Sequence, residues 1–208
     1  MTKPYPIPAR TTRIENVVVN SRFIATAARA DSVDEAKAFI QSIRAEMPDA
    51  THHVYAFKIG YGGSVIEGMS DDGEPSGTSG PPVLAVLRGA EIGDIVVVVT
   101  RYFGGTKLGT GGLVRAYGGA AKDVLAALPV ELKIEKALVG MTVEYSYYER
   151  LKLLLEAHHA QIVNEDFAAE VTVFARLPAD QVPALSDALQ NLTAGQSELI
   201  VLEQSTEP

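Results

Sequence analysis

Residues 95–121 read IVVVVTRYFGGTKLGTGGLVRAYGGAA, a short apolar run followed by a glycine-rich loop and a helix-like segment. The run holds one isoleucine and four valines, which predicts a central strand with both faces buried. We expect Thr110 to cap the helix that follows. The apolar stripe of that helix predicts which residues point inward: Leu113, Ala116, Tyr117, Ala120 and Val124. The segment therefore predicts a strand, a tight loop and a helix that packs against the sheet.

Glycine is concentrated around this segment. Sixteen of the eighteen glycines lie between Gly60 and Gly119, and the same passage begins at residues 69–82 with the acidic stretch MSDDGEPSGTSGPP. Glycine is used where the backbone takes a positive φ or where another group approaches it closely. Together with the charged residues among them, these glycines indicate a built site.

The distribution of charge indicates two domains. A chain of 208 residues suits one large or two small domains, at about 150 residues per domain. Residues 1–128 hold 13 basic and 13 acidic residues, whereas residues 129–208 hold 5 and 13 and carry the whole net charge of −8. With Pro129 as a plausible joint, we predict domains at 1–129 and 130–208. The net negative charge of the second domain argues against its binding nucleic acid, which needs a basic surface.

Composition excludes several classes of protein. The sequence has no cysteine, so it forms no disulfide, cysteine zinc site or thiol nucleophile, and it fits a reducing compartment. No signal-peptide pattern follows the first methionine. No apolar run exceeds five residues, while a membrane span needs roughly 20. These features predict a soluble, cytoplasmic protein with no membrane partner.

Further elements of the first domain follow from periodicity and caps. Two hairpins are predicted, with strands at 12–20 and 21–28 and at 53–59 and 64–69. A capping box from Ser32 to Glu35 predicts the start of a helix. Thr78 or Ser79 is expected to cap a second, short helix that begins at Pro81.

The second domain has a clearer pattern. Alternating residues predict strands at 135–145, 161–167, 170–175 and 198–202. A capping box from Ser146 to Glu149 predicts one helix, and residues 180–192 predict another. The resulting order β-α-β-β-α-β matches a ferredoxin-like sandwich, so the fold class of the whole chain is α+β.

The glycine loop at residues 104–112 follows a strand and precedes a helix, which is a context suited to phosphate. It is not a Walker A loop, because Thr110 stands where the lysine belongs. Nor is it a dinucleotide fingerprint, because Val114 stands where the third glycine belongs. Two readings stay open: an anion-binding site of another type, or a tight crossover that needs glycine for packing.

Charged residues around the loop define the candidate site. Arg101 ends the strand, Lys107 lies in the loop and Arg115 lies early in the helix, so the three cations are expected to converge. The acidic loop offers carboxylates for a metal or for acid–base work, although it lacks the EF-hand register. Helix capping or salt bridges are the favoured explanation of these carboxylates. We assign no catalytic residue, metal or cofactor. The candidate ligand-binding residues are Asp72, Glu74, Arg101, Gly104, Gly105, Lys107, Gly109, Gly111, Gly112 and Arg115.

His52 and His53 are adjacent on a predicted strand, so their side chains point to opposite faces. They are therefore not expected to hold one metal together. One of them is expected to face the candidate site.

Five motifs in this order closely resemble those of the YigZ/Impact family, over roughly residues 15–125. They are SRFI at 21–24, THHVYAF at 51–57, DDGEPSGT at 71–78, VTRYFGGTKLG at 99–109 and GGLVRAY at 111–117. The resemblance implies an N-terminal α/β sandwich folded like the second domain of a small-subunit ribosomal protein. It also implies a ferredoxin-like C-terminal domain similar to the last domain of elongation factor G.

The resemblance bears on function less directly. Eukaryotic members of the family restrain a starvation-responsive kinase by competing for its activator, and they use an additional N-terminal interaction domain. This chain begins almost directly with the shared domain, so that activity is not carried over.

Three functions stay open. The first is a non-enzymatic regulator whose N-terminal domain binds RNA, the ribosome or a translation factor. Its acidic C-terminal domain then binds a protein or has a purely structural role. The second is an enzyme that acts on a small phosphate- or carboxylate-bearing substrate, with Glu74 or Asp72 as base or metal ligand and Arg101 and Lys107 on the anion. The third is a single-stranded nucleic-acid binder that stacks bases on Tyr102, Phe103 and Tyr117.

Overall fold

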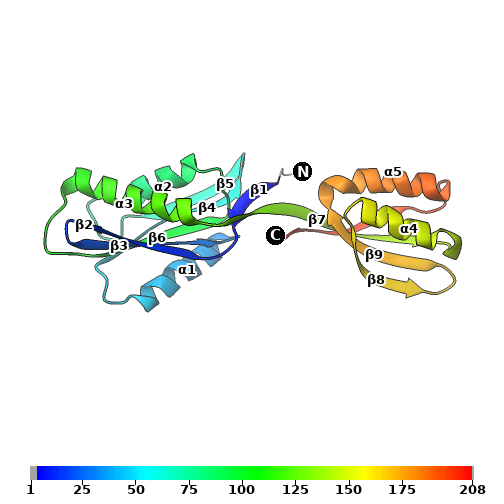
Figure 1. The fold of residues 1–208 in the computed structure, drawn as a ribbon, viewed down its shortest axis with the longest axis horizontal. Helices are drawn as coiled ribbons and strands as arrows, with labels where there is room; N and C mark the ends of the chain where they lie inside the picture. Colours follow the sequence, from blue (N-terminus) through cyan, green and yellow to red (C-terminus); the bar gives the residue numbers. More distant parts are fainter. Residues whose placement is uncertain (1–3, 208) are drawn as a thin grey trace. The chain divides into compact units, whose positions relative to one another are not determined.

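The computed structural model describes residues 4–207, and the chain divides into two compact units between Leu132 and Lys133. The first unit is built on a five-stranded antiparallel sheet in the order β2-β3-β6-β4-β5. Helix α1 covers one face of this sheet, and α2 and α3 cover the other (Figure 1). The strands are β2 (Thr12–Val18), β3 (Ser21–Arg29), β4 (His52–Tyr61), β5 (Ser64–Ser70) and β6 (Ile95–Tyr102).

Strand β6 is the central strand that the sequence predicts. Because successive side chains point to opposite faces, its apolar run supplies both cores of the unit. Val97 and Val99 pack beneath α2 (Gly80–Gly89) and α3 (Gly109–Ala127). Val96 and Val98 pack beneath α1 (Val33–Glu46). The five residues of α3 predicted to point inward are all buried, which confirms its orientation.

The predicted helix caps are only partly confirmed. The Ser32 hydroxyl accepts the Glu35 N–H at the start of α1, as expected. Helix α3 begins at Gly109, and Thr110 lies inside its first turn, so the predicted Thr110 cap is wrong. Leu108 occupies the N-cap position instead, and Gly109 turns the chain with a φ of +69°, so the helix starts before the threonine.

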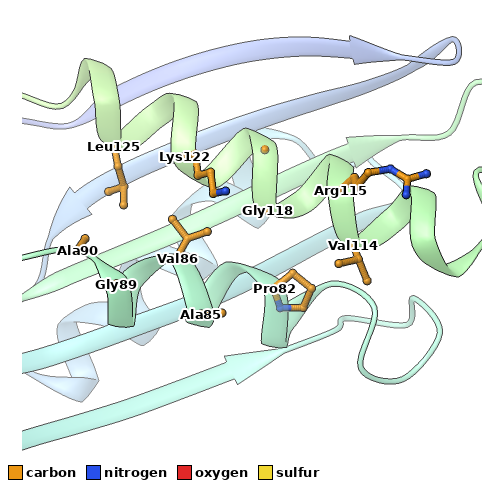
Figure 2. Close-up of a pocket in the computed structure, with 11 residues that line it drawn as sticks. Pro82, Ala85, Val86, Gly89, Ala90, Val114, Arg115, Gly118, Lys122 and Leu125 are labelled. Carbon is orange, nitrogen blue, oxygen red and sulfur yellow. The ribbon is translucent and has the colours of Figure 1, made fainter.

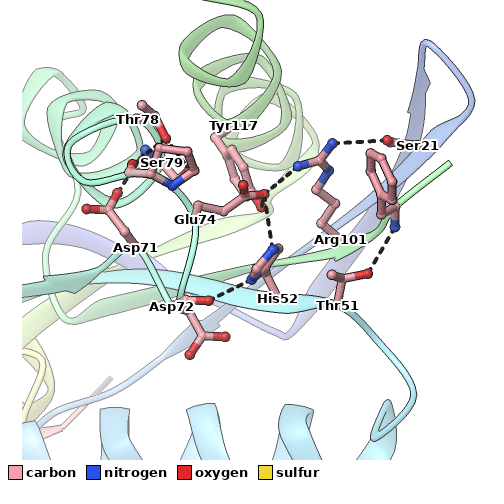
Figure 3. A network of polar contacts seen from close by, with 12 residues as sticks. Ser21, Thr51, His52, Asp71, Asp72, Glu74, Thr78, Ser79, Arg101 and Tyr117 are labelled. Carbon is pink, nitrogen blue, oxygen red and sulfur yellow. Dashed lines mark hydrogen bonds and ion pairs between the residues drawn. The ribbon is translucent and has the colours of Figure 1, made fainter. Parts of the chain in front are cut away.

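Helix α2 takes its cap from elsewhere in the sequence. Ser79 occupies the N-cap position, but its side chain makes no capping hydrogen bond. The Asp71 carboxylate does so instead and accepts the N–H groups of Gly77, Ser79 and Gly80 at 2.8, 2.9 and 2.8 Å (Figure 3). An acid of the loop therefore fixes the start of the helix and meets its positive end.

The second unit has the predicted element order β-α-β-β-α-β. Its antiparallel strands lie in the order β10-β7-β9-β8, and α4 and α5 share one core with the sheet. Strand β1 (Tyr5–Pro8) belongs to the first unit. The elements are β7 (Val130–Val143), α4 (Tyr145–Ala157), β8 (Gln161–Phe167), β9 (Val171–Pro178), a 3-10 turn (Ala179–Gln181), α5 (Val182–Thr193) and β10 (Leu199–Glu207).

Boundaries in the second unit differ from the prediction at several places: β9 and β10 run to Pro178 and Glu207, beyond the predicted ends, and α5 begins at Val182. Strand β7 begins at Val130, five residues before the predicted start, because the sheet continues beyond the alternating stretch. Helix α4 begins at Tyr145 directly after the strand, with Glu144 at its N-cap, so the predicted Ser146 cap is wrong. No helix within residues 4–207 is long and apolar enough to cross a membrane.

The Asp71 cap yields a prediction for the substitution Asp71→Asn. Burial acts to raise the pKa of Asp71, but the three N–H donors outweigh it and hold the pKa below its ordinary value of 3.8. A carboxyl group with a lowered pKa stabilises the fold above the unfolded pKa and loses that contribution as the pH falls. We expect the variant to lose about 1 kcal/mol at neutral pH and less at a pH below 3.8, measured by urea unfolding.

Asp34→Asn is the matched control, because Asp34 lies in the first turn of α1 and is exposed. It should change the unfolding free energy by only a few tenths of a kcal/mol. An effect of Asp71→Asn that stays the same at both pH values would contradict the cap.

Candidate functional site

A buried ion pair lies at the centre of the candidate site (Figure 3). Arg101, near the end of β6, donates from Nη1 to Glu74 Oε1 at 2.6 Å, and the two residues are only 4% and 8% exposed. Its Nη2 donates to the Ser21 hydroxyl at 3.2 Å, at the start of β3. Glu74 and Arg101 of the predicted site therefore lie together in the structure. Their contacts hold the acidic loop against strands β3 and β6.

Tyr117 ties helix α3 to the same pair. Its hydroxyl donates to Glu74 Oε1 at 2.8 Å, and its ring packs edge-on against Phe23 with the ring centres 5.2 Å apart. Burial, aided by the hydrogen bond to Glu74, raises the pKa of Tyr117 far above its ordinary value. The hydroxyl therefore keeps its proton and acts as a fixed donor. The sequence indicated Tyr117 as a core residue or as a platform for stacking bases, and its ring is fully buried. The periodicity gave no sign of the hydrogen bond from its hydroxyl.

The two adjacent histidines point to opposite faces of β4, as the alternation predicts. His52 faces the site: its Nδ1 donates to the Asp72 carbonyl at 2.7 Å, and its Nε2 lies 3.8 Å from Glu74 Oε1. His53 lies on the other face, with Nδ1 3.1 Å from the Thr100 hydroxyl. Burial lowers the pKa of His53, with a smaller contribution from Arg44. Within residues 4–207, no three acidic, histidine or cysteine side chains gather to hold a metal.

The carboxylate of Asp72 does not join Glu74. It pairs with Arg44 of α1 and accepts the backbone N–H of His53 at 2.5 Å. Burial acts to raise the pKa of Asp72, but these two donors outweigh it and lower the pKa. Its neighbour Asp71 caps α2, so each acid of the loop serves a different part of the fold.

A cavity of about 410 Å³ opens beside the ion pair. Its lining includes Glu74, Arg101, Lys107 and Gly109 of the predicted site, together with His52. Arg115 and Gly112 line a separate hollow of about 340 Å³, which Lys107 also borders. The expected convergence of three cations is thus incomplete: Arg101 is neutralised by Glu74, whereas Lys107 and Arg115 are exposed and form no ion pair within the described residues.

The glycines of the loop serve the backbone in different ways. A β-carbon on Gly104 would lie 2.1 Å from the Asn20 carbonyl oxygen, so this glycine allows two segments to touch. Gly105 and Gly109 have φ values of +83° and +69°, which glycine adopts without strain. A β-carbon on Gly111 would meet only the Arg115 guanidinium, at 3.6 Å, while one on Gly112 would press on Leu108 at 3.0 Å. Packing and turn geometry therefore account for most of the loop.

The fold and the site together define a class: a two-domain α+β protein with a buried Glu–Arg pair beneath a glycine-rich helix start. Residues 19–125 match the Impact N-terminal domain, and residues 141–196 match a domain of unknown function, DUF1949. The chain belongs to the IMPACT family.

Relatives match along nearly the whole chain. The chain is 40% identical over 199 residues to the IMPACT family member YigZ of Escherichia coli (strain K12), covering 95% of this chain and 98% of that one. It is 41% identical over 183 residues to an IMPACT family member of Thermus thermophilus, covering 86% and 97% of the two chains. A crystal structure of a hypothetical protein is also similar, with 40% identity, a TM-score of 0.70 and coverage of 98% and 99%.

The ion pair yields a second prediction. Arg101→Met leaves the Glu74 carboxylate buried with the Tyr117 hydroxyl and the more distant His52 ring as polar neighbours, so we expect a loss of about 3–5 kcal/mol in the free energy of unfolding. Glu74→Gln leaves the Arg101 guanidinium buried without its carboxylate partner, and we expect a similar loss. The double variant removes both charges and should lose clearly less than the sum of the single variants, which denaturant titration of all four proteins measures. Additive losses would contradict a coupled pair.

Proposed function

We propose that this protein is a non-enzymatic regulator that associates with translation by binding RNA, the ribosome or a protein partner. One observation carries the proposal. The acidic side chains that catalysis would need are bound to other residues of the fold, while cations of the glycine-rich region are exposed. Glu74 is bound to Arg101 and Tyr117, and Asp72 to Arg44. Lys107 and Arg115 are exposed. Such an arrangement suits recognition of an anionic partner.

Fold-level likeness supports the link to translation. We propose that the first unit corresponds to the second domain of a small-subunit ribosomal protein. We propose that the second unit is a ferredoxin-like sandwich similar to the last domain of elongation factor G, because its element order and its strand order β10-β7-β9-β8 agree with that architecture. Likeness of fold supports the setting of the function and leaves the partner to be identified by experiment.

The acidic second domain has a different part in this proposal. Residues 129–208 carry 13 acidic and 5 basic side chains, so this domain repels a phosphate backbone. It therefore contributes a protein contact, while the first domain holds the cationic surface.

The proposal is tested by ribosome co-sedimentation of the full chain at low and moderate salt. We expect the wild type to pellet with ribosomes and Lys107→Ala/Arg115→Ala to do so several-fold less, because two cations are lost from the surface. If RNA is the partner, the affinity falls as salt is added, and each lost phosphate contact makes the plot of log affinity against log salt concentration less steep by roughly 0.7–0.9.

Lys37→Ala is the matched control, because Lys37 is exposed on α1, on the other face of the sheet. It should pellet like the wild type. A wild-type protein that stays in the supernatant at low salt would rule the proposal out, and an equal loss in the control would assign the association to net charge alone.

A second candidate function is favoured by the cavity beside the ion pair. We propose as the alternative an enzyme that acts on a small phosphate- or carboxylate-bearing substrate. The volume of about 410 Å³ lies within the range of small-molecule sites, roughly 300–1,000 Å³. Glu74 would act as the base and Lys107 would hold the anion, whereas the Asp72 carboxylate is occupied by Arg44.

Thermal denaturation with added ligands tests this alternative. A ligand at 100 times its dissociation constant stabilises a protein by about 2.7 kcal/mol, which raises the melting temperature measurably. Inorganic phosphate, nucleotides and sugar phosphates are the probes, and Lys107→Ala should abolish any rise. Unchanged melting with all of them would count against an enzyme.

A further inference from the structure

Helices α2 and α3 lie side by side on one face of the first sheet and leave a groove of about 770 Å³ between them (Figure 2). Its walls are apolar and include Pro82 and Val86 from α2 and Val114 and Leu125 from α3. The cavity beside the ion pair is a separate hollow, whose lining includes His52, Glu74 and Arg101.

Three glycines line this groove at positions where the fold does not require glycine. A β-carbon on Gly89 or Gly119 would meet nothing within 4 Å, and one on Gly118 would meet only Pro82, at 3.9 Å. None of the three has a positive φ. Alanine would fit at each of these helical positions and would favour the helix, so the fold itself gives no reason for glycine. Their missing side chains instead let another backbone come close.

Two cations border the groove. Arg115 and Lys122 both line it, both are exposed, and neither forms an ion pair within residues 4–207. They lie seven positions apart on α3, which is two helical turns or roughly 10 Å along the helix axis. In the part of the chain that the structure describes, no acidic residue lines the groove. Its charge therefore complements an acidic partner whose carboxylates share that spacing.

We infer that the groove between α2 and α3 is a docking site for an amphipathic helix of a protein partner. The docked helix presents small and apolar residues to the groove and two acidic residues, seven positions apart, to Arg115 and Lys122. This mode of recognition lays the apolar face of a helix into a hydrophobic groove. The inference rests on the proposed function, in that the chain acts by binding, and it names protein as the partner class.

The apolar walls favour a peptide over RNA. A phosphate backbone laid against Val86, Val114 and Leu125 would lose water without gaining hydrogen bonds from them, which is unfavourable. An apolar helix face gains from the same contact, because both surfaces leave water. The two cations then set the position and direction of the helix.

The direct test uses the full chain and a fluorescent synthetic helical peptide. The peptide carries an alanine–leucine face and two glutamates seven residues apart. A second peptide replaces both glutamates by lysine, and a single-stranded oligouridylate is the RNA probe. We expect saturable binding of the glutamate peptide by fluorescence anisotropy, with backbone amide NMR shifts gathered on α2 and α3.

Variants locate the binding. Gly119→Leu fills the groove and should weaken the glutamate peptide at least roughly tenfold. Ala126→Leu is the matched control, because it adds the same side chain to an exposed position of α3 outside the groove lining. The double reversal Arg115→Glu/Lys122→Glu should lose the glutamate peptide and gain the lysine peptide. Unchanged helical circular dichroism shows that each variant is folded.

Four outcomes would overturn the inference. They are no saturable binding of the glutamate peptide, equal binding of the lysine peptide to the wild type, equal effects of Gly119→Leu and Ala126→Leu, and oligouridylate binding that Gly119→Leu weakens. If one occurs while the wild type still pellets with ribosomes, the groove assignment fails and the proposed function stands. If the wild type does not pellet, the proposed function fails whatever the peptide does.

Discussion

The buried pair of Glu74 and Arg101 is the interaction on which the rest of the first unit's site depends. Moving two charges out of water is unfavourable unless each finds its partners, and here the carboxylate also accepts the Tyr117 hydroxyl while the guanidinium reaches Ser21. The position of each group is therefore strongly restricted. The acidic loop, the end of β6 and the middle of α3 are held together by one set of contacts, and the cavity beside them takes its shape from it.

Periodicity predicted much of the fold, because it reports directly on which residues are buried. The apolar run of β6, the inward stripe of α3 and the β-α-β-β-α-β order of the second unit are all of this kind. Caps were less predictable, since a cap depends on where a neighbouring segment ends in space. Asp71 reaches α2 from several residues away, and Leu108 begins the turn before Thr110. The pairing of Asp72 with Arg44 likewise joins the loop to a helix that the local pattern does not connect with it.

Glycine density marked the right region without distinguishing its causes. Gly104 is required because two segments touch there, and Gly105 because of its backbone angle. Neither reason applies to Gly119, and only the three-dimensional structure distinguishes it from Gly104 and Gly105. Gly119 lies beside Gly118 and lines the same groove as Gly89. The same holds for the charged residues. Arg101 and Lys107 are both cations, but Arg101 forms a buried ion pair with Glu74, whereas Lys107 is exposed.

The ion pair also has a consequence for how the chain folds during synthesis. Its hydrogen bond from Arg101 to Ser21 joins residues 80 positions apart, and that from Tyr117 to Glu74 spans 43. Contacts between such distant residues form slowly, because long loops must close first. An emerging chain has the β2–β3 hairpin early but no partner for the Glu74 carboxylate until β6 is available. The site therefore cannot be complete until α3 has left the ribosome, because Tyr117 lies on that helix.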